Sequence, residues 1–211
     1  MRLPALLLLL TCAPAHAGGW LQEQGHGFAA AGVSLNGNAP RLHLEYGLSE
    51  TLTLGLTGWG GTDGTSGETL AFARRKIPVP LLDQWHFAAE IGAGAHRSSQ
   101  GKEDAIFSLA LGAGRGLPWG WLDLSAQITF ASTNPVDWRG TDQISLGYNV
   151  TDSFAVMGQW RAETLGLEGT TTSGALFAIW RARPSLRVVA EAEQDFSTDS
   201  PDFRVSLWSE F

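Results

Sequence analysis

Residues 41–57 read Arg-Leu-His-Leu-Glu-Tyr-Gly-Leu-Ser-Glu-Thr-Leu-Thr-Leu-Gly-Leu-Thr. Apolar side chains alternate with polar or small ones over 41–48 and again over 51–57. A period of two is that of a β-strand, because successive side chains of a strand point to opposite faces of the sheet. Turn-forming residues at 47–50 separate the two halves. The stretch therefore predicts a β-hairpin with one apolar face.

The same alternation recurs along the chain. Its clearest further examples are the segments 84–96, 107–113, 121–130, 143–149 and 186–195. Segments 153–163 and 203–211 are also counted as strands, and so are 28–35, 70–77 and 175–181, whose facing the pattern does not assign. The sum is about twelve strands, with about ten as the alternative, at a spacing that suits the 9–11 residues of a tilted membrane-spanning strand.

The predicted connections alternate in character. One set is short: 47–51, 77–83, 116–120, 149–152 and 183–185. The other is longer and polar: 36–39, 60–68, 97–103, 133–140, 164–172 and 197–201. Short periplasmic turns and longer extracellular loops are typical of outer-membrane barrels, and this arrangement would put both chain ends on the periplasmic side. The predicted fold class is all-β, a closed antiparallel transmembrane β-barrel, since only a closed sheet leaves no unpaired edge in lipid.

The first residues have the features of a secretory signal peptide. Arg2 supplies positive charge, residues 6–10 are an unbroken run of leucine, and Ala15-His16-Ala17 is a small-x-small cleavage site. We expect cleavage after Ala17, so that 1–17 is a removed signal peptide and 18–211 is a single barrel domain. The leucine run is far shorter than the ~20 apolar residues of a membrane-spanning helix, and no later segment comes closer.

Composition excludes several classes of protein. Cys12 is the only cysteine and falls within the expected signal peptide, although residues 9–12 faintly resemble a lipoprotein cleavage box. Without Cys12 the mature chain can form no disulfide and no thiolate metal site. The net charge of −7 argues against a nucleic-acid-binding face. Tryptophan collects at membrane–water interfaces. Five of the nine tryptophans lie near predicted strand ends, where an interfacial girdle would be: Trp59, Trp85, Trp121, Trp138 and Trp180.

The last ten residues, 202–211, place Phe203, Val205, Leu207 and the terminal Phe211 on one face. An aromatic C-terminus preceded by apolar residues at every second position resembles the terminal strand by which Gram-negative outer-membrane barrels are recognised for assembly. Ser209 departs from that pattern. The alternative is the last strand of a soluble sandwich.

Residues 46–55 also resemble a periplasmic hairpin of small, poorly characterised proteobacterial barrels, some of them described as transporters. Together the two resemblances cover two strands and the terminal signature. They imply an outer-membrane location and three partners: outer-membrane lipid, lipopolysaccharide and the barrel assembly machinery. They imply little about a solute.

The strand face opposite the leucines is polar and charged. The side chains predicted to line the lumen are Arg41, His43, Glu45, His86, Glu90, Asp123, Gln127, Arg161, Arg187, Glu191, Glu193 and Arg204. Such a face suits a hydrated or salt-bridged lumen. An unpaired charge in a narrow interior has a large desolvation cost. We therefore expect Arg161, Arg187 and Arg204 to lie opposite acids, such as Glu45, Glu90, Glu191 and Glu193.

The sequence predicts no catalytic residue, no metal site and no cofactor. His86, Glu90 and His96 share a strand face, but His86 and His96 would be ~33 Å apart at about 3.3 Å per residue. The run 112–116 has the glycines of a phosphate-binding loop without its helix or lysine, and is predicted to be a strand entering a turn. The run 60–64 carries one acid, too few oxygen ligands for calcium.

Three functions follow from these features. The first is a narrow passive channel for small solutes whose lumenal charges set selectivity. The second is a non-conducting structural or surface-interaction barrel with a plugged lumen. The third, the least supported, is an outer-membrane lipid-modifying hydrolase with a histidine, a serine and an acid in contact.

Overall fold

The computed structural model describes residues 18–37, 39–61, 64–133, 138–166 and 169–211. The expected signal peptide, 1–17, lies outside this part of the chain. Among the described residues, no helix has both the length and the apolar character needed to cross a membrane.

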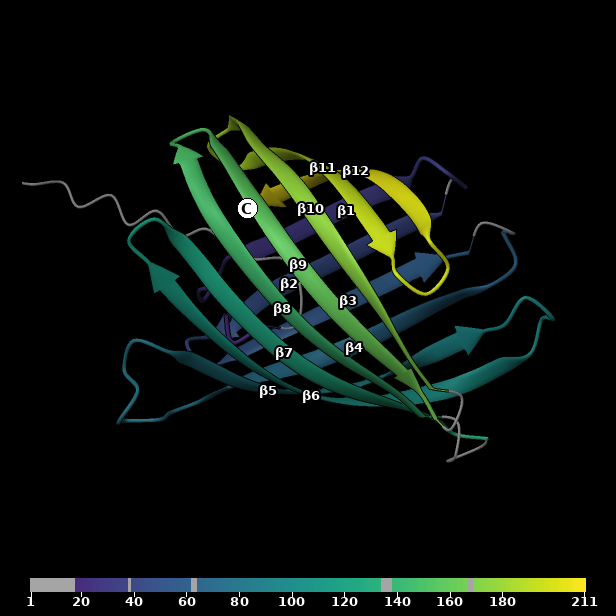
Figure 1. The fold of residues 1–211 in the computed structure, drawn as a ribbon. Coiled ribbons are helices and arrows are strands. Elements are labelled where there is room, and N and C mark those ends of the chain that lie inside the picture. Colours follow the sequence, from purple (N-terminus) through teal and green to yellow (C-terminus); the bar gives the residue numbers. More distant parts are fainter. Residues whose placement is uncertain (1–17, 38, 62–63, 134–137, 167–168) are drawn as a thin grey trace, which may run out of the picture.

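Twelve antiparallel strands form one closed barrel (Figure 1). They are β1 (Gly27–Ser34), β2 (Pro40–Ser49), β3 (Leu52–Gly60), β4 (Gly67–Ile77), β5 (His86–Arg97), β6 (Glu103–Leu117), β7 (Gly120–Ala131), β8 (Trp138–Thr151), β9 (Phe154–Leu165), β10 (Gly169–Arg183), β11 (Leu186–Asp195) and β12 (Ser200–Glu210). Each strand pairs with its neighbours in the sequence, and β1 closes the sheet on β12 from Phe28 opposite Glu210 to Ser34 opposite Arg204. The predicted closed antiparallel barrel of about twelve strands is confirmed.

The two ends of the barrel differ. At one end, called the turn end here, the connections are 50–51, 118–119, 152–153 and 184–185, with a longer one at 78–85. Both ends of the sheet meet there, because the backbone N–H of Gly27 donates to the carbonyl of Phe211 at 2.7 Å. The opposite end, called the loop end, has the remaining connections.

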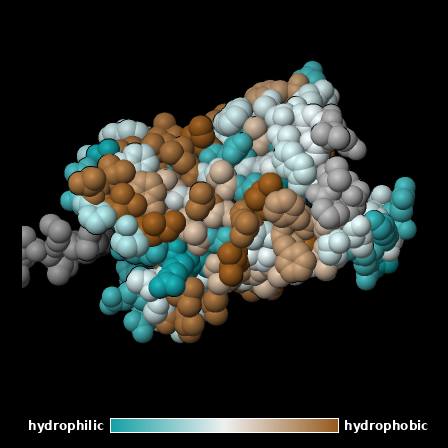
Figure 2. Space-filling model, turned by 90° about the horizontal axis from the view of Figure 1, so that it is seen from below, coloured by the Kyte–Doolittle hydropathy of each residue, from teal (hydrophilic) through white to brown (hydrophobic). Residues whose placement is uncertain are grey.

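Large apolar side chains cover much of the outer wall, and Figure 2 shows them as brown patches on the side that it views. Leu109, Leu111, Leu146 and Leu207 are about half exposed, and Leu176 is 72% exposed. The polar residues that alternate with them point inward, as the period of two requires.

The structure assigns the facing of the three strands that the pattern left open. Phe28 on β1, Phe72 on β4 and Phe177 on β10 are buried inside, whereas Leu176 and Trp180 face outward. The alternation is blurred in these strands because part of the interior is itself apolar. This inner cluster consists of Phe28, Ala30, Trp121, Ala155, Met157, Ala175, Phe177, Ile179, Val189 and Trp208.

Trp121 corrects one expectation about the girdle. Its side chain is 4% exposed and lies inside the barrel, over Gly147 on the neighbouring strand β8. A Cβ atom on Gly147 would come within 2.1 Å of the Trp121 ring. Trp59 corrects another: it shares the inward face of β3 with the buried Thr53, and its ring lies 6.2 Å from that of His96. Trp180 is exposed on the outer wall, as an interfacial role requires.

Candidate functional site

Residues 18–25 run inside the turn end of the barrel, and we call them the N-terminal strap. The backbone N–H of Gln22 donates to Oγ1 of Thr53 at 2.9 Å, and the Trp20 ring lies 4.4 Å from the His86 ring between centroids. Where the strap leaves the interior, Gly25 N–H donates to the carbonyl of Gly47 at 2.9 Å. The strap therefore occupies lumen that strands alone would leave open.

Glycines on both sides allow the strap to approach the wall of β6. A Cβ atom on Gly112 would come within 2.4 Å of the carbonyl carbon of Gly18, and one on Gly114 within 2.3 Å of Nε1 of Trp20. On the strap, a Cβ atom on Gly19 would come within 1.9 Å of the His86 carbonyl oxygen. Glycine in a strand commonly marks such a close approach. The run 112–116, which belongs to β6 as a strand entering a turn, thus has a specific structural role.

A buried ionic cluster, the Arg74 cluster, joins the strap to the wall. Arg74, 3% exposed, donates from Nη1 to Oε1 of Glu45 at 2.8 Å and from Nε to Oε2 of Glu90 at 3.0 Å. Arg74 Nη1 also donates to the Trp20 carbonyl at 3.1 Å. Gln22 donates to the second oxygen of Glu45 at 2.7 Å. Two predicted lumenal acids therefore meet one arginine, Arg74, on a strand whose facing the alternation leaves unassigned.

A second ionic cluster, the Arg204 cluster, lies on β11 and β12. Arg204 donates to Glu191 at 2.5 Å and to Glu193 at 2.6 Å, and its Nη2 is 2.6 Å from Asp202. Nη1 of Arg161 on β9 lies 3.9 Å from Oε1 of Glu193. Glu191 and Glu193 can share Arg204 because residues two apart on a strand point to the same face.

Arg187 departs from the expected pairing. Its partner is Glu210, at 2.7 Å, and Glu45 and Glu90 are taken by Arg74. The sequence could not assign these partners, because they depend on how far each strand is staggered against the next around the barrel.

One ion pair crosses the interior near the loop end. Nη2 of Arg139, on β8, lies 2.7 and 2.8 Å from the two carboxylate oxygens of Glu68, on β4, although these strands are not neighbours in the sheet. Nδ1 of His96 is 3.5 Å from the same carboxylate. Both members of the pair lie in segments predicted to be loops. The strands extend further than the alternation indicated, which is why this bridge was missed.

The predicted lumenal residues do not converge on one site. The buried ones are His43, Glu45, Glu90, Asp123 and Arg187. The half-buried ones are His86, Gln127, Arg161, Glu191, Glu193 and Arg204, while Arg41 is exposed. Among the described residues, no three histidine, cysteine or acidic side chains are placed to hold a metal ion.

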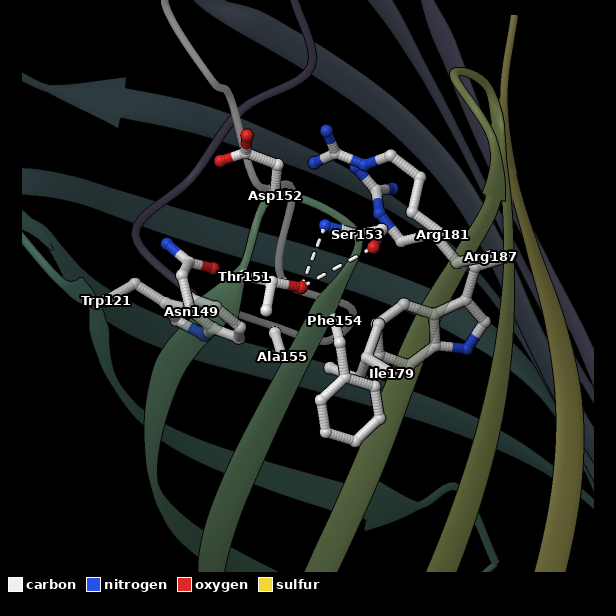
Figure 3. A pocket seen from close by; sticks show the side chains of 11 residues that line it. Trp121, Asn149, Thr151, Asp152, Ser153, Phe154, Ala155, Ile179, Arg181 and Arg187 are labelled. Atoms are coloured by element: carbon white, nitrogen blue, oxygen red, sulfur yellow. Dashed lines mark hydrogen bonds between the residues drawn. The ribbon is translucent and has the colours of Figure 1, made fainter.

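A pocket of about 380 Å³, part of it open to solvent, lies at the turn end of β8 to β11 (Figure 3). Trp121 and Ile179 form its apolar side, and Arg181 and Arg187 lie together on the other. Thr151 accepts a hydrogen bond from the Ser153 backbone N–H at 3.3 Å and so shapes the turn beside it.

Comparison with solved structures identifies the architecture. The KdgM porin in complex with disordered oligogalacturonate aligns with a TM-score of 0.66 at 11% identity, covering 88% of this chain and 99% of that one. The fold is that of outer-membrane channel barrels. The NanC porin has a TM-score of 0.60 at 11% identity, and the alignment covers 86% of this chain and 98% of that one. The COG4313 outer membrane channel from Pseudomonas putida F1 has a TM-score of 0.63 at 14% identity, and the alignment covers 94% of this chain and 98% of that one.

No protein-family model and no curated protein matches the chain. At these low identities the likeness to the solved channels concerns the fold alone.

Proposed function

We propose that this protein is a narrow passive channel for small solutes in the outer membrane of a Gram-negative bacterium. The observation that carries the proposal is the division of the wall: charged residues gather inside a closed barrel whose outer face is largely apolar. Water would disfavour so large an exposed apolar surface, whereas lipid would cover it. The turn end then faces the periplasm and the loop end the outside.

Export and assembly belong to the same proposal. A signal peptide cleaved after Ala17 would deliver the chain to the periplasm. The C-terminal signature residues Phe203, Val205, Leu207 and Phe211 are each 40% or more exposed on the outer wall. They are positioned to be read by the barrel assembly machinery and then to contact lipid or lipopolysaccharide.

The lumenal charges would set selectivity. Arg41, Arg161 and Arg204 offer positive charge to a passing solute, and Glu191 and Glu193 offer negative charge close by. Rings or patches of charge in a narrow pore act on ions by attraction and by electrostatic barriers. The KdgM porin was solved with oligogalacturonate. The mixed charges of the present lumen leave the sign of the preferred solute to experiment.

The strap and the bridge between Glu68 and Arg139 favour a closed resting state. Both fill lumen that a solute would have to cross. They also support the second candidate, a non-conducting barrel whose lumen stays plugged. The two candidates differ in one property, because a channel must conduct once the strap is displaced.

Removing the strap tests this difference. We expect a refolded chain that begins at Gly25, and so keeps all twelve strands, to hold a steady conductance in planar bilayers. The chain that begins at Gly18 should open rarely and briefly. Both barrels must first show heat-modifiable migration in detergent gels, which reports folding. Two folded barrels that are equally silent would support the plugged barrel and rule out the channel.

The bridge at the loop end gives a second prediction. In the strapless chain, Arg139→Gln should increase single-channel conductance and shift the reversal potential in a salt gradient towards cation preference. The substitution removes a positive charge and frees the Glu68 carboxylate. Arg97→Gln is the matched control, because Arg97 is an exposed loop-end arginine 3.9 Å from Glu103. Equal selectivity in the two variants would show that the bridge does not line the conducting path.

A further inference from the structure

Asp123 is a buried acid whose pairing is incomplete. It lies on β7 with 2% of its surface exposed. Its carboxylate accepts a hydrogen bond from the backbone N–H of Gly19. Its Oδ1 atom has no hydrogen-bond partner among the described residues, and none of their cationic groups lies within 4.0 Å. A buried carboxylate normally has a cation or several donors, because leaving it unpaired is costly.

The surroundings of Asp123 carry an excess of negative charge. Arg74 is the arginine that acts on it electrostatically. That guanidinium is already engaged by the carboxylates of Glu45 and Glu90. Three buried carboxylates therefore lie around one arginine, and His43, whose Nε2 contacts this cluster, is 2.9 Å from Glu45 rather than beside Asp123. No cationic side chain of the described residues pairs with Asp123. This part of the lumen is therefore short of one positive charge.

The backbone of Gly18 lies directly against the unpaired oxygen. A Cβ atom built on Gly18 would come within 1.9 Å of Oδ1 of Asp123 and 2.5 Å of Cγ. Only glycine fits here without displacing the carboxylate. Gly18 is also the residue that the cleavage-site pattern makes the first of the mature chain.

We propose that Asp123 is the binding site for the α-ammonium group of Gly18, which cleavage of the Ala17–Gly18 bond creates. Hydrolysis by a signal peptidase adds the hydroxyl of water to the Ala17 carbonyl carbon and a proton to the Gly18 nitrogen. That amine takes up a further proton at neutral pH. The resulting cation forms charge-assisted hydrogen bonds to the Asp123 carboxylate.

This pairing would hold the strap, as a lock, only after the signal peptide has been cleaved off. In the uncut chain the Gly18 nitrogen is an uncharged amide and cannot neutralise Asp123. After cleavage the ammonium group neutralises the Asp123 carboxylate and holds the strap across the turn end. The inference rests on the proposed cleavage after Ala17 and is independent of whether the barrel conducts.

Chemical protection of the terminal amine tests the inference. Barrels isolated from outer membranes of cells that express the full precursor are treated near pH 7 with an acetylating ester that reacts with free amines. Mass spectrometry of the N-terminal peptide then identifies the first residue and its extent of acetylation. We expect the Gly18 amine of the folded protein to react at least about tenfold more slowly than that of the unfolded protein.

Three variants separate the lock from general burial. Asp123→Asn should restore most of the amine reactivity, because the amide cannot neutralise the cation. Gly18→Ala retains both charges but adds a methyl group that would overlap the Asp123 carboxylate, so it should also restore reactivity of the amine. If Asp123→Asn does not fold, Gly18→Ala provides the test. Asp152→Asn, an exposed acid in a turn at the same end, should leave protection unchanged.

Two results would overturn the proposal. One is a first residue other than Gly18, which would disprove the cleavage site while leaving the bilayer test of conduction unaffected. The other is a Gly18 amine that reacts as fast in the folded wild type as in the unfolded chain, or stays equally protected in folded Asp123→Asn and Gly18→Ala.

Discussion

Replacing Arg74 with methionine will lower the free energy of unfolding by about 3–5 kcal/mol, the usual cost of removing one partner from a buried ion pair. The substitution keeps an unbranched chain of similar length but leaves the carboxylates of Glu45 and Glu90 without their shared cation. It also removes the hydrogen bond to the Trp20 carbonyl, which ties the strap to the wall. Arg74→Lys should lose less, because it keeps the charge and loses only the forked geometry.

Guanidinium unfolding of the barrel in lipid vesicles, followed by tryptophan fluorescence, would measure this difference. Arg75→Met is the matched control, since Arg75 is the next residue and lies exposed on the outer wall. Its loss should change stability by no more than the ~1 kcal/mol typical of exposed charges. Equal midpoints for the two variants would mean that the Arg74 cluster does not stabilise the barrel.

Leu176→Arg will lower stability by about 2–4 kcal/mol in a bilayer if the outer wall faces lipid. Leu176 is at the middle of β10 and is 72% exposed. A guanidinium there would sit at mid-bilayer depth, where its desolvation is not compensated. In a water-soluble barrel the same substitution would be harmless, so the result also tests the proposed membrane location.

Two controls test whether the loss of stability depends on the depth of the arginine in the membrane. Leu176→Met changes shape but not polarity and should behave like the wild type. Val150→Arg places the same charge on the outer face near the turn end of β8, where the cost should fall to about 0–1 kcal/mol. Similar losses for the arginines at 150 and 176 would contradict the assigned position of the membrane.

The strand positions were open to prediction because alternation is a local property. In 41–57 or 121–130, each side chain's face follows from its neighbours two residues away, whatever lies across the barrel. The prediction weakened where the interior itself is apolar, as at Phe28, Phe72 and Phe177. Inward and outward residues then look alike, and the strand carrying Arg74, Arg75 and Lys76 could not be oriented.

The partners of the charges could not be predicted, because they depend on contacts between distant strands. Arg139 meets Glu68 across the lumen, 71 residues away in the sequence. Arg187 takes Glu210 because β11 and β12 place both at the turn end. The strap was missed for a related reason: residues 18–25 lack strand alternation, and the glycines that receive them, Gly112 and Gly114, are on another part of the chain.

The sequence by itself determined the strands and, for most of them, which face is apolar and which is polar, because residues two apart on a strand share a face. Only the tertiary structure decided what occupies that interior. The folded barrel sets Gly18 against Asp123 on β7 and ties Arg74 on β4 to the same strap. These contacts join residues far apart in the sequence, so they form only when the whole sheet has curved onto itself.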